Sequence, residues 1–378
     1  MGVDFVNAYV DHKFDGSHRL QYDFDANKHV FKDVKGFGSA DGKSKVLTSA
    51  YDTFEDVMAD AAGRKIIVDS DIECNSTFTG ASYNGTTIEG AGGTITVAHN
   101  GALFSAVEDM VFEGVWFIGA NNPAYVNNCL IAGACHRLAM TLCDAYQFYN
   151  VFNIAYFPEN MKIIINSFRE ALDYIAWGAG NYCTWMGNQF RESKNGMYAQ
   201  GYFPSIIGNS INNMHGGLVK SGTGIFVGNC YENKPGIIKG NTIYYCGEAI
   251  YCGQRGNAAI IANQIADCYY GIKCIADTSQ VAALEILNNV FVTGTFISCI
   301  EFLSHADGYD DLTIEGNKMR QQAVATNGIK FAVSENGLRS FKNNDFEKAT
   351  NPIILYSAAQ ERAIKAYDNN IGTITYTA

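Results

Sequence analysis

The sequence predicts an all-β protein, a parallel β-helix or solenoid, closed at its N-terminal end by a short α-helix. This fold is supported by an asparagine that returns at intervals, by apolar residues that keep their place relative to it, and by the composition. The 378 residues include 38 Gly, 22 Tyr and 23 Phe but only 5 Pro, and 17% of the residues are charged. Such a composition favours strands joined by tight turns over helices.

The asparagine repeat predicts the turns of the solenoid. From residue 166 onward an Asn returns every 21 to 32 residues, and the longest step, between Asn209 and Asn241, is expected to hold an insertion. A period in the twenties with short apolar runs is typical of a β-helix, in which each unit is one turn, stacked about 4.8 Å from the next. The repeated residues are Asn166, Asn188, Asn209, Asn241, Asn263, Asn289, Asn317, Asn344 and, in a looser form, Asn370.

Asparagine has a physical reason to mark each turn. It tolerates the left-handed backbone of a tight corner, and its side-chain amide can bond to the asparagines above and below. We therefore expect a ladder of asparagines at one corner of the solenoid.

Other columns of residues agree with this register. Cys246 and Cys268 are 22 residues apart, as are Cys252 and Cys274. The eleven cysteines, an odd number at strand-like positions, favour buried thiols in such columns over disulfides, which are the alternative. The apolar slot two residues after each asparagine holds Phe168, Phe190, Ile211, Ile243, Ile265, Phe291, Met319 and Phe346.

A helix is predicted ahead of the repeats, in SAYDTFEDVMADAAGRK, residues 49–65. Apolar residues recur at helical spacing from Tyr51 to Met58, Asp52 is placed to cap the helix and Gly63 to end it. Such a helix would cover the open first turn, whose backbone groups are otherwise unpaired. The expected divisions are an N-terminal attachment arm over 1–48, a capping helix over 49–64 and the β-helix over 65–378.

Charge and segment patterns exclude several functions. The net charge of -11 argues against nucleic acid as a partner, because the phosphate backbone rewards clusters of Lys and Arg. The N-terminus has no basic start followed by an apolar core, so no secretory signal is predicted. No run of 18 apolar residues is present, so no membrane insertion is expected. We predict no cofactor and no metal.

The segment SKVLTSAYDTFEDVMADAAGRKIIVDSDIECNSTFTG, followed by many turns of the form Gly-Asn-x-Ile, resembles bacteriophage tailspikes. These are trimeric, right-handed parallel β-helix proteins of the pectin-lyase-like class. The resemblance implies a homotrimer on a virion tail, made in the host cytoplasm and acting at the bacterial cell surface. It further implies binding and hydrolysis of a surface polysaccharide, an O-antigen or a capsule. Residues 168–185, rich in aromatics, are expected to be covered by the threefold partners.

An outward column on the strand after the asparagine corner is a candidate binding surface for sugars. Aromatic faces stack on pyranose rings and polar side chains take hydroxyls, although a solvated sheet with a Lys-Glu-Lys ladder is the alternative reading. The inward residues of this strand are expected to be Met197, Leu218, Ile250, Ile272, Ile300 and Ile329. The outward column is expected to hold Tyr198, Val219, Tyr251, Lys273, Glu301 and Lys330, with Trp177 beside its entrance.

Carboxylates supply the predicted chemistry. Glu170 and Glu192 hold equivalent places one turn apart, and Asp173 lies three residues after Glu170. Two close carboxyls resist joint ionisation, which provides an acid and a base, the pair that glycoside hydrolysis needs. We assign Glu170 or Glu192 as the acid and Asp173 as the base, in a pattern similar to that of endorhamnosidase-type tailspikes. The alternative is that Arg169 and Arg191 simply neutralise the two glutamates.

Other functions stay open at this point. A polysaccharide lyase would use Tyr198, Tyr251 or His215 as the base, and a receptor-binding spike would need the aromatic column alone. Glu248, Asp267 and Glu301 are further outward acids. The segment HADGYDD, residues 305–311, lacks the ligand spacing of a calcium loop.

Overall fold

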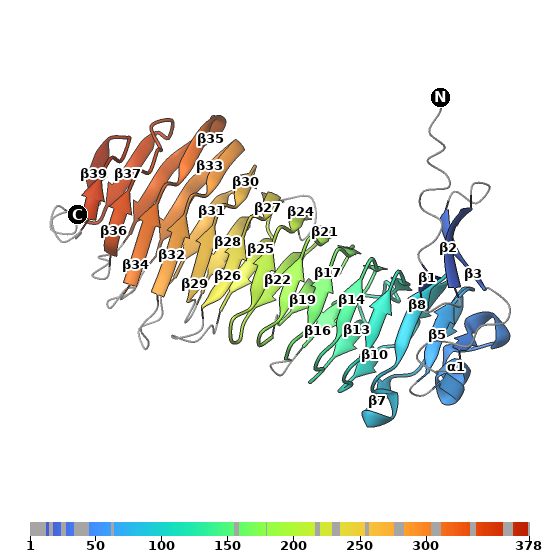
Figure 1. Cartoon of the computed structure of the whole chain (residues 1–378). Coiled ribbons are helices and arrows are strands. Elements are labelled where there is room, and N and C mark those ends of the chain that lie inside the picture. The colour runs from blue at the N-terminus through green and yellow to red at the C-terminus, as the bar shows by residue number, and fades with distance from the viewer. Residues whose placement is uncertain are drawn as a thin grey trace.

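The computed structural model describes most of the chain and shows a right-handed parallel β-helix of about 12 turns. Figure 1 shows the turns stacked along one axis from α1 to β39. The described residues are 13–14, 18–23, 28–33, 45–61, 64–154, 159–178, 180–215, 220–228, 235–253, 257–275, 283–303, 311–332, 338–357 and 366–376.

Each turn contributes strands to three faces, and all pairings between turns are parallel. The first face is a sheet of 14 strands. They are β4 Lys45–Leu47, β5 Lys65–Val68, β8 Thr87–Gly90, β11 Val111–Glu113, β14 Ala139–Thr141, β17 Lys162–Ile164, β20 Thr184–Met186, β23 Ser205–Ile207, β26 Gly236–Lys239, β29 Ala258–Ile261, β32 Ala283–Leu287, β34 Asp311–Glu315, β36 Leu338–Lys342 and β38 Ala366–Asp368.

The second and third faces belong to one sheet of 22 strands. The second face consists of β6 Ile72–Cys74, β9 Thr94–Val97, β12 Trp116–Ile118, β15 Asp144–Tyr146, β18 Ser167–Arg169, β21 Gln189–Ser193, β24 Ser210–Met214, β27 Thr242–Cys246 and β30 Gln264–Ala266. The third face consists of β7 Phe78–Thr79, β10 Ala102–Ser105, β13 Cys129–Ala132, β16 Phe152–Asn153, β19 Tyr174–Trp177, β22 Asn195–Ala199, β25 Thr223–Val227, β28 Glu248–Cys252, β31 Tyr270–Cys274, β37 Asn351–Leu355 and β39 Ile374–Tyr376. Two long strands run through both faces, β33 Val290–Phe302 and β35 Lys318–Phe331.

The asparagine ladder is confirmed, at the corner between the first and second faces. From Asn166 to Asn344, each Nδ2 donates to Oδ1 of the next asparagine at 2.9–3.0 Å, and the last acceptor is Asn370. Each of these Nδ2 groups also donates to a backbone carbonyl of the preceding turn, as Asn188 does to Ile163. The ladder therefore satisfies buried polar groups that would each cost about 1–3 kcal/mol if left unpaired.

The left-handed residue of this corner is not the asparagine, as the sequence suggested, but the residue before it. Ile165 has φ 55° and Gly187 has φ 66°, and the equivalent residues of other turns agree with them. The asparagine keeps its amide aligned with its neighbours along the solenoid, while the preceding residue makes the bend. The left-handed residues of this column are Gly114, Leu142, Ile165, Gly187, Gly208, Gly240, Ala262, Asn288, Gly316, Asn343 and Asn369.

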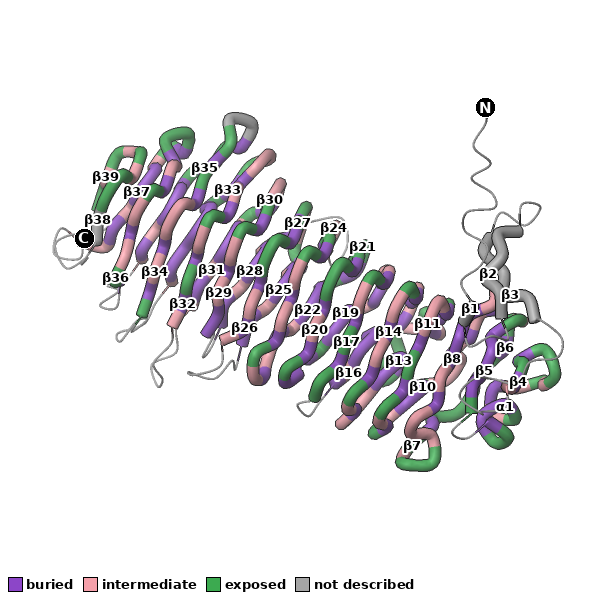
Figure 2. Tube along the Cα trace, viewed as in Figure 1, coloured by how far each residue is buried: buried purple, intermediate pink, exposed green. Residues whose placement is uncertain are grey.

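Inward columns fill the interior as predicted. The rings of Phe168 and Phe190 stack with centroids 5.7 Å apart, and the column continues in register through Ile211 and Ile243. The buried residues recur on every turn in Figure 2. Burying one such side chain contributes about 1.5–3 kcal/mol. Trp185, counted among the exposed-looking aromatics of the sequence, is fully buried in this core.

The two cysteine pairs lie in register as expected. Cys252 pairs with Cys274 across adjacent strands, and the Cys246 backbone N–H donates to the Cys268 sulfur at 3.4 Å. All four are buried thiols, and none of them is in a disulfide. Within the described part of the chain, the buried-thiol interpretation holds over the disulfide alternative.

The capping helix is confirmed as α1, Phe54–Ala61, which follows a short 3₁₀ helix η1, Thr48–Ala50. It covers the N-terminal end of the solenoid (Figure 1) and buries Phe54, whose ring lies 5.7 Å from that of Phe78. The cap differs from the expected Asp52, because Thr53 Oγ1 accepts the Asp56 backbone N–H at 3.3 Å. A second 3₁₀ helix, η2, spans Ala81–Tyr83.

Ahead of the helix, β4 already pairs with β5, so the first face begins before α1. Three further strands, β1 Lys13–Phe14, β2 His18–Asp23 and β3 Lys28–Asp33, form a small antiparallel sheet. The rest of the expected arm, and Gly63, lie outside the described residues. None of the described helices is long and apolar enough to cross a bilayer.

Candidate functional site

Four aromatic side chains form a continuous strip on the outer side of the third face. Trp177, Tyr198, Phe226 and Tyr251 are register partners on β19, β22, β25 and β28. Their ring centroids lie 4.8, 4.6 and 4.9 Å apart in that order. We call these four residues the aromatic strip. Its rings pack against one another along four successive turns, with Trp177 exposed and the other three partly exposed.

Phe226 corrects the sequence prediction at one position. The expected outward residue of this turn was Val219 and the expected inward residue was Leu218, but Phe226 and Ile225 occupy these columns. The cause is the long step between Asn209 and Asn241, whose extra residues displace the strand toward the C-terminus. Residues 216–219 lie outside the described part of the chain.

The column becomes charged beyond the aromatic strip. Lys273 Nζ lies 2.6 Å from Glu248 Oε1 and above the Tyr270 ring, 4.5 Å from its centroid. One turn further, Lys330 Nζ donates to Glu301 Oε1 at 2.8 Å. The expected Lys-Glu-Lys column is therefore present in register, and Glu301 is buried. It forms a polar end to the aromatic strip.

The predicted carboxylates lie at the corner between the second and third faces. Glu170 and Glu192 are adjacent, since their strands pair from Ser167 to Arg169 and the Glu170 backbone N–H donates to Arg191 O at 3.1 Å. Both glutamates are left-handed, with φ 55° and 53°. A left-handed residue with a long side chain is strained and is therefore a reason to consider function.

Neighbouring side chains hold Glu170 in place. Arg169 Nη1 donates to its Oε1 at 3.1 Å, and Gln147 Nε2 donates to its Oε2 at 3.1 Å. The alternative in which an arginine neutralises a glutamate is therefore realised for Glu170. The guanidinium of Arg169 also lies over the Tyr146 ring, 4.3 Å from its centroid.

Asp173 connects this corner to the aromatic strip. Its backbone carbonyl accepts the Asn195 N–H at 2.8 Å, and its carboxylate forms an ion pair with Lys194 Nζ at 3.1 Å. The next residue, Tyr174, makes an edge contact with Trp177, with centroids 4.8 Å apart. Glu170, Asp173 and the first ring of the strip are thus brought to the same edge of the solenoid.

The remaining candidates lie elsewhere. Asp267 is left-handed at the same corner several turns away and forms an ion pair with Lys220. Asp311, the last residue of the HADGYDD segment, forms an ion pair with Arg339 at 3.0 Å on the first face. Residues 305–310 lie outside the described part of the chain. His215 follows β24, and its backbone N–H donates to Ser193 O at 2.8 Å.

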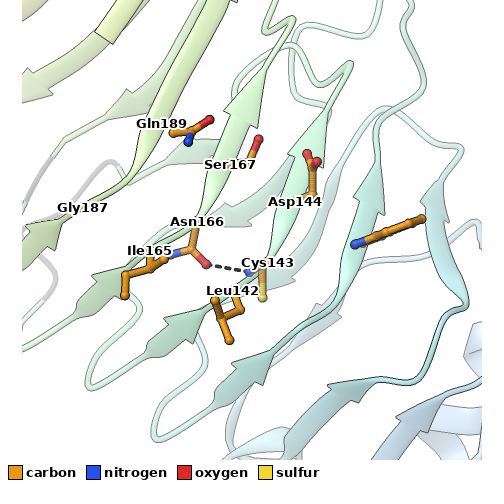
Figure 3. Close-up of a pocket in the computed structure, with 9 residues that line it drawn as sticks. Leu142, Cys143, Asp144, Ile165, Asn166, Ser167, Gly187 and Gln189 are labelled. Carbon is orange, nitrogen blue, oxygen red and sulfur yellow. Dashed lines mark hydrogen bonds between the residues drawn. The ribbon is translucent and has the colours of Figure 1, made fainter. Parts of the chain in front are cut away.

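Sequence reasoning missed Asp144, which lines a pocket on the second face beside the asparagine corner (Figure 3). Burial raises the pKa of the Asp144 carboxyl above its usual value, against the opposing effect of Arg169 and Arg191. The sequence did contain a signal for Asp144, because it lies one turn before Ser167 and in the same column. The asparagine of that turn is replaced by Cys143, so the repeat alignment stopped short of it.

The described residues offer no group of three or more His, Cys, Asp or Glu placed to hold a metal ion. Burial raises the pKa of the Cys74, Cys129, Cys143 and Cys183 thiols to about 12. These thiols are therefore protonated at neutral pH and face the core, whereas metal ligation needs a thiolate.

Comparisons with known proteins agree with the fold. A family model described as "Periplasmic copper-binding protein (NosD)" matches residues 62–301. None of the curated proteins matches the chain. The catalytic unit of the GH87 α-1,3-glucanase of Streptomyces thermodiastaticus has a TM-score of 0.56 at 13% identity, over 89% of this chain and 69% of the glucanase chain. The A-module of the Azotobacter vinelandii mannuronan C-5 epimerase AlgE4 has a TM-score of 0.49 at 11% identity, over 83% and 90%. At 13% identity the likeness to the glucanase shows the fold alone.

Proposed function

The chain belongs to the NosD family, and we propose that it is a carbohydrate-active β-helix. In this proposal it binds a bacterial surface polysaccharide along the aromatic strip. It hydrolyses the polysaccharide at the corner between the second and third faces. The observation that carries this proposal is the aromatic strip itself. Four rings on consecutive turns, ending in charged side chains, form a linear surface suited to a chain of sugar rings. The solenoid's spacing repeats the contact along the polymer.

Hydrolysis is proposed for the carboxylates at the start of the strip. Glu170 or Glu192 would protonate the leaving oxygen, and Asp173 would activate water or attack directly. Arg169 and Gln147 orient the Glu170 carboxyl, and Lys194 orients that of Asp173. These contacts fix the two carboxyls relative to Trp177, which would position the first sugar ring.

Copper, which the family description names, does not fit the described residues. Copper prefers thiolate, thioether and imidazole ligands. The described cysteines are buried in the core, and the side chains at the corner are carboxylates that already pair with Arg169 and Lys194. No step of the proposed reaction passes through copper.

The setting proposed for this activity is that of a tailspike, a homotrimer on a virion tail that acts at the bacterial surface. The exposed Tyr182 and Phe203, with ring centroids 5.8 Å apart, support a contact between protomers. Light scattering coupled to gel filtration tests the trimer, and binding of the purified protein to intact bacteria tests the place of action.

A lyase and a non-catalytic binding spike are the competing functions. A lyase would use Tyr198 or Tyr251 as the base, and burial raises the pKa of Tyr251 further from neutrality, which disfavours it in that role. A binding spike would need the aromatic strip alone. Products separate the three, because hydrolysis gives saturated reducing ends, a lyase gives an unsaturated uronate and a spike gives no products.

The deciding experiment measures reducing ends and product masses from a panel of bacterial surface polysaccharides. The parent is compared with Glu170→Gln, Asp173→Asn and Glu192→Gln, and exposed Glu347→Gln serves as the matched control. We expect saturated oligosaccharides from the parent and the control, and losses of about 10²-fold or more in at least two of the three site variants. Full activity in all three would place the chemistry elsewhere, and binding without products would leave a spike.

A further inference from the structure

The pocket that Asp144 lines lies on the second face, whereas the aromatic strip lies on the third. The volume of the pocket is about 270 Å³, close to the lower end of the range of about 300–1,000 Å³ typical of small-molecule sites, and it is open to solvent. Its polar floor is one column of register partners, in which Asp144 pairs with Ser167 and Ser167 with Gln189. Figure 3 shows these three side chains side by side on neighbouring strands. Trp116 precedes Asp144 in the same column.

The apolar wall of the pocket is built from strained residues. Leu142 and Ile165 are left-handed, with φ 57° and 55°, at a corner where most later turns use Gly or Asn. A left-handed conformation costs a residue with a side chain about 1–2 kcal/mol. Both side chains are also exposed, by 58% and 55%, as is Trp116 by 53%. Neither burial nor backbone geometry accounts for these residues, but a ligand that covers them does.

The polar side of the pocket has unused hydrogen-bonding capacity. Among the described residues, Ser167 Oγ and Asp144 Oδ1 of the pocket lining are buried atoms without a hydrogen-bond partner, and so is Nε of Arg169, which neighbours Asp144 but does not line the pocket. Asp144 Oδ1 and Arg169 Nε lie 3.7 Å apart, close enough for an ion pair but too far for a hydrogen bond. Buried polar groups in native proteins are nearly always paired, so these atoms indicate a missing partner.

We infer that this pocket binds a single glycosyl unit, at a site separate from the aromatic strip. A pyranose has one apolar face and a rim of hydroxyls, which matches a pocket lined by the apolar side chains of Trp116, Leu142 and Ile165 together with a row of carboxylate, hydroxyl and amide groups. The ligand class follows from the pocket alone. The inference therefore does not depend on whether the aromatic strip binds or cleaves a polymer.

The three tryptophans of the chain provide the test. Trp185 is buried, so in a Trp177→Phe background Trp116 is the exposed emitter. We titrate this protein with methyl glycosides of hexoses, 6-deoxyhexoses, N-acetylhexosamines and hexuronic acids, and expect a saturable change in emission with at least one of them. Asp144→Asn should weaken that binding about tenfold or more, and Ser167→Ala about threefold or more. Ser210→Ala, in the same column but outside the pocket, should leave it unchanged.

The outcomes that overturn the inference are equally defined. It fails if Trp116 emission does not saturate with any of the glycosides, if it responds only to divalent cations, or if Asp144→Asn behaves as Ser210→Ala does. Circular dichroism and thermal melting confirm that each variant is folded. A Trp116→Phe variant, in which Trp177 reports on the aromatic strip, is titrated with the polysaccharide panel in parallel. Failure of the strip and failure of the pocket therefore give different results.

Discussion

Ile165 and Gly208 occupy the same left-handed corner of the solenoid, two turns apart, with φ 55° and 63°. A Cβ added at Gly208 would meet no atom within 4 Å, so at this atom the two positions differ in backbone cost and not in space. Ile165→Gly should raise the free energy of unfolding by about 0.5–1 kcal/mol, after the entropy cost of glycine is subtracted from the relieved strain. Gly208→Ile should lower it by the same amount, about 0.5–1 kcal/mol, because the smaller backbone entropy loss of Ile on folding offsets part of the strain. Denaturant unfolding of the two variants measures both, and the same sign for the two would contradict the assignment of strain.

The asparagine ladder makes Asn263 a large contributor to stability. Its amide donates to Ile238 O at 3.0 Å and to Asn289 Oδ1 at 2.9 Å, and its Oδ1 accepts from Asn241. Asn263→Ala leaves these buried groups unpaired and should cost about 2–4 kcal/mol. Asn343→Gly, at an exposed left-handed corner, is the matched control and should change stability by less than about 0.5 kcal/mol. Equal losses in the two would show that the ladder is not what stabilises this corner.

Asp144 should lower stability as the pH rises. Burial raises the pKa of Asp144 in the folded state above 3.8, its usual value in the unfolded state. At a pH between the unfolded-state pKa and the folded-state pKa, the folded state therefore holds more protons than the unfolded state. The free energy of unfolding falls as the pH rises through this range. Asp144→Asn lacks this penalty, so its melting temperature relative to the parent should rise from low pH to neutrality. The control is Asp109→Asn, because Arg137 lowers the pKa of Asp109, and the relative melting temperature should change in the opposite direction. Thermal melts of the three proteins across this range check both signs.

The buried thiols should be unreactive in the folded protein. Burial raises the pKa of Cys74, Cys129, Cys143 and Cys183 to about 12. It also raises the pKa of Cys299 well above its usual value. Because the thiolate is the nucleophile, iodoacetamide at neutral pH should modify none of these five until denaturant is added. Mass spectrometry of digests made before and after unfolding measures this. Modification of any of them at the rate seen in denaturant would contradict their burial.

Phe226 should contribute to polysaccharide binding although the sequence pattern placed Val219 there. Phe226→Ala interrupts the aromatic strip between Tyr198 and Tyr251 and should weaken binding by about 1–2 kcal/mol, or roughly 5- to 30-fold. Tyr244→Ala, an exposed ring on the second face, is the control and should leave the affinity unchanged. Isothermal titration calorimetry, with the polysaccharide that the parent protein binds, measures the affinity of both variants. Equal losses of affinity in the two would show that the aromatic strip is not the binding surface.

The fold was predictable because its evidence is periodic. Asn166 and Asn188 occur in one sequence pattern, and each turn repeats the same demand for a corner, an inward ring and a short strand. Periodicity also sets the limit of the prediction. Counting forward from Asn209 placed Val219 in the outward column, because the extra residues of that turn cannot be assigned to loop or strand from spacing alone.

The candidate site was predictable only in part. The corner that brings Glu170 beside Glu192 follows from the repeat, and so does the place of Tyr198 beside Trp177. The partners that orient Glu170 do not, since Gln147 comes from a turn without the asparagine signal. For the same reason Asp144 was missed. Its raised pKa depends on burial and on the charges around it, which spacing does not report.

The asparagine ladder also makes the length of this protein a matter of whole turns. Asn166 and Asn188 are 22 residues apart, and the side-chain amide of each donates to the next asparagine of the ladder. Excision of residues 167–188 therefore joins Asn166 directly to Gln189, at the start of the strand that follows Asn188 in the full chain. The shortened chain would keep an unbroken row of amides, while a cut that does not remove a whole number of turns would place a different residue in the row. Natural gain or loss of single turns, and deliberate resizing of the molecule, can therefore proceed one repeat at a time without redesigning the interior.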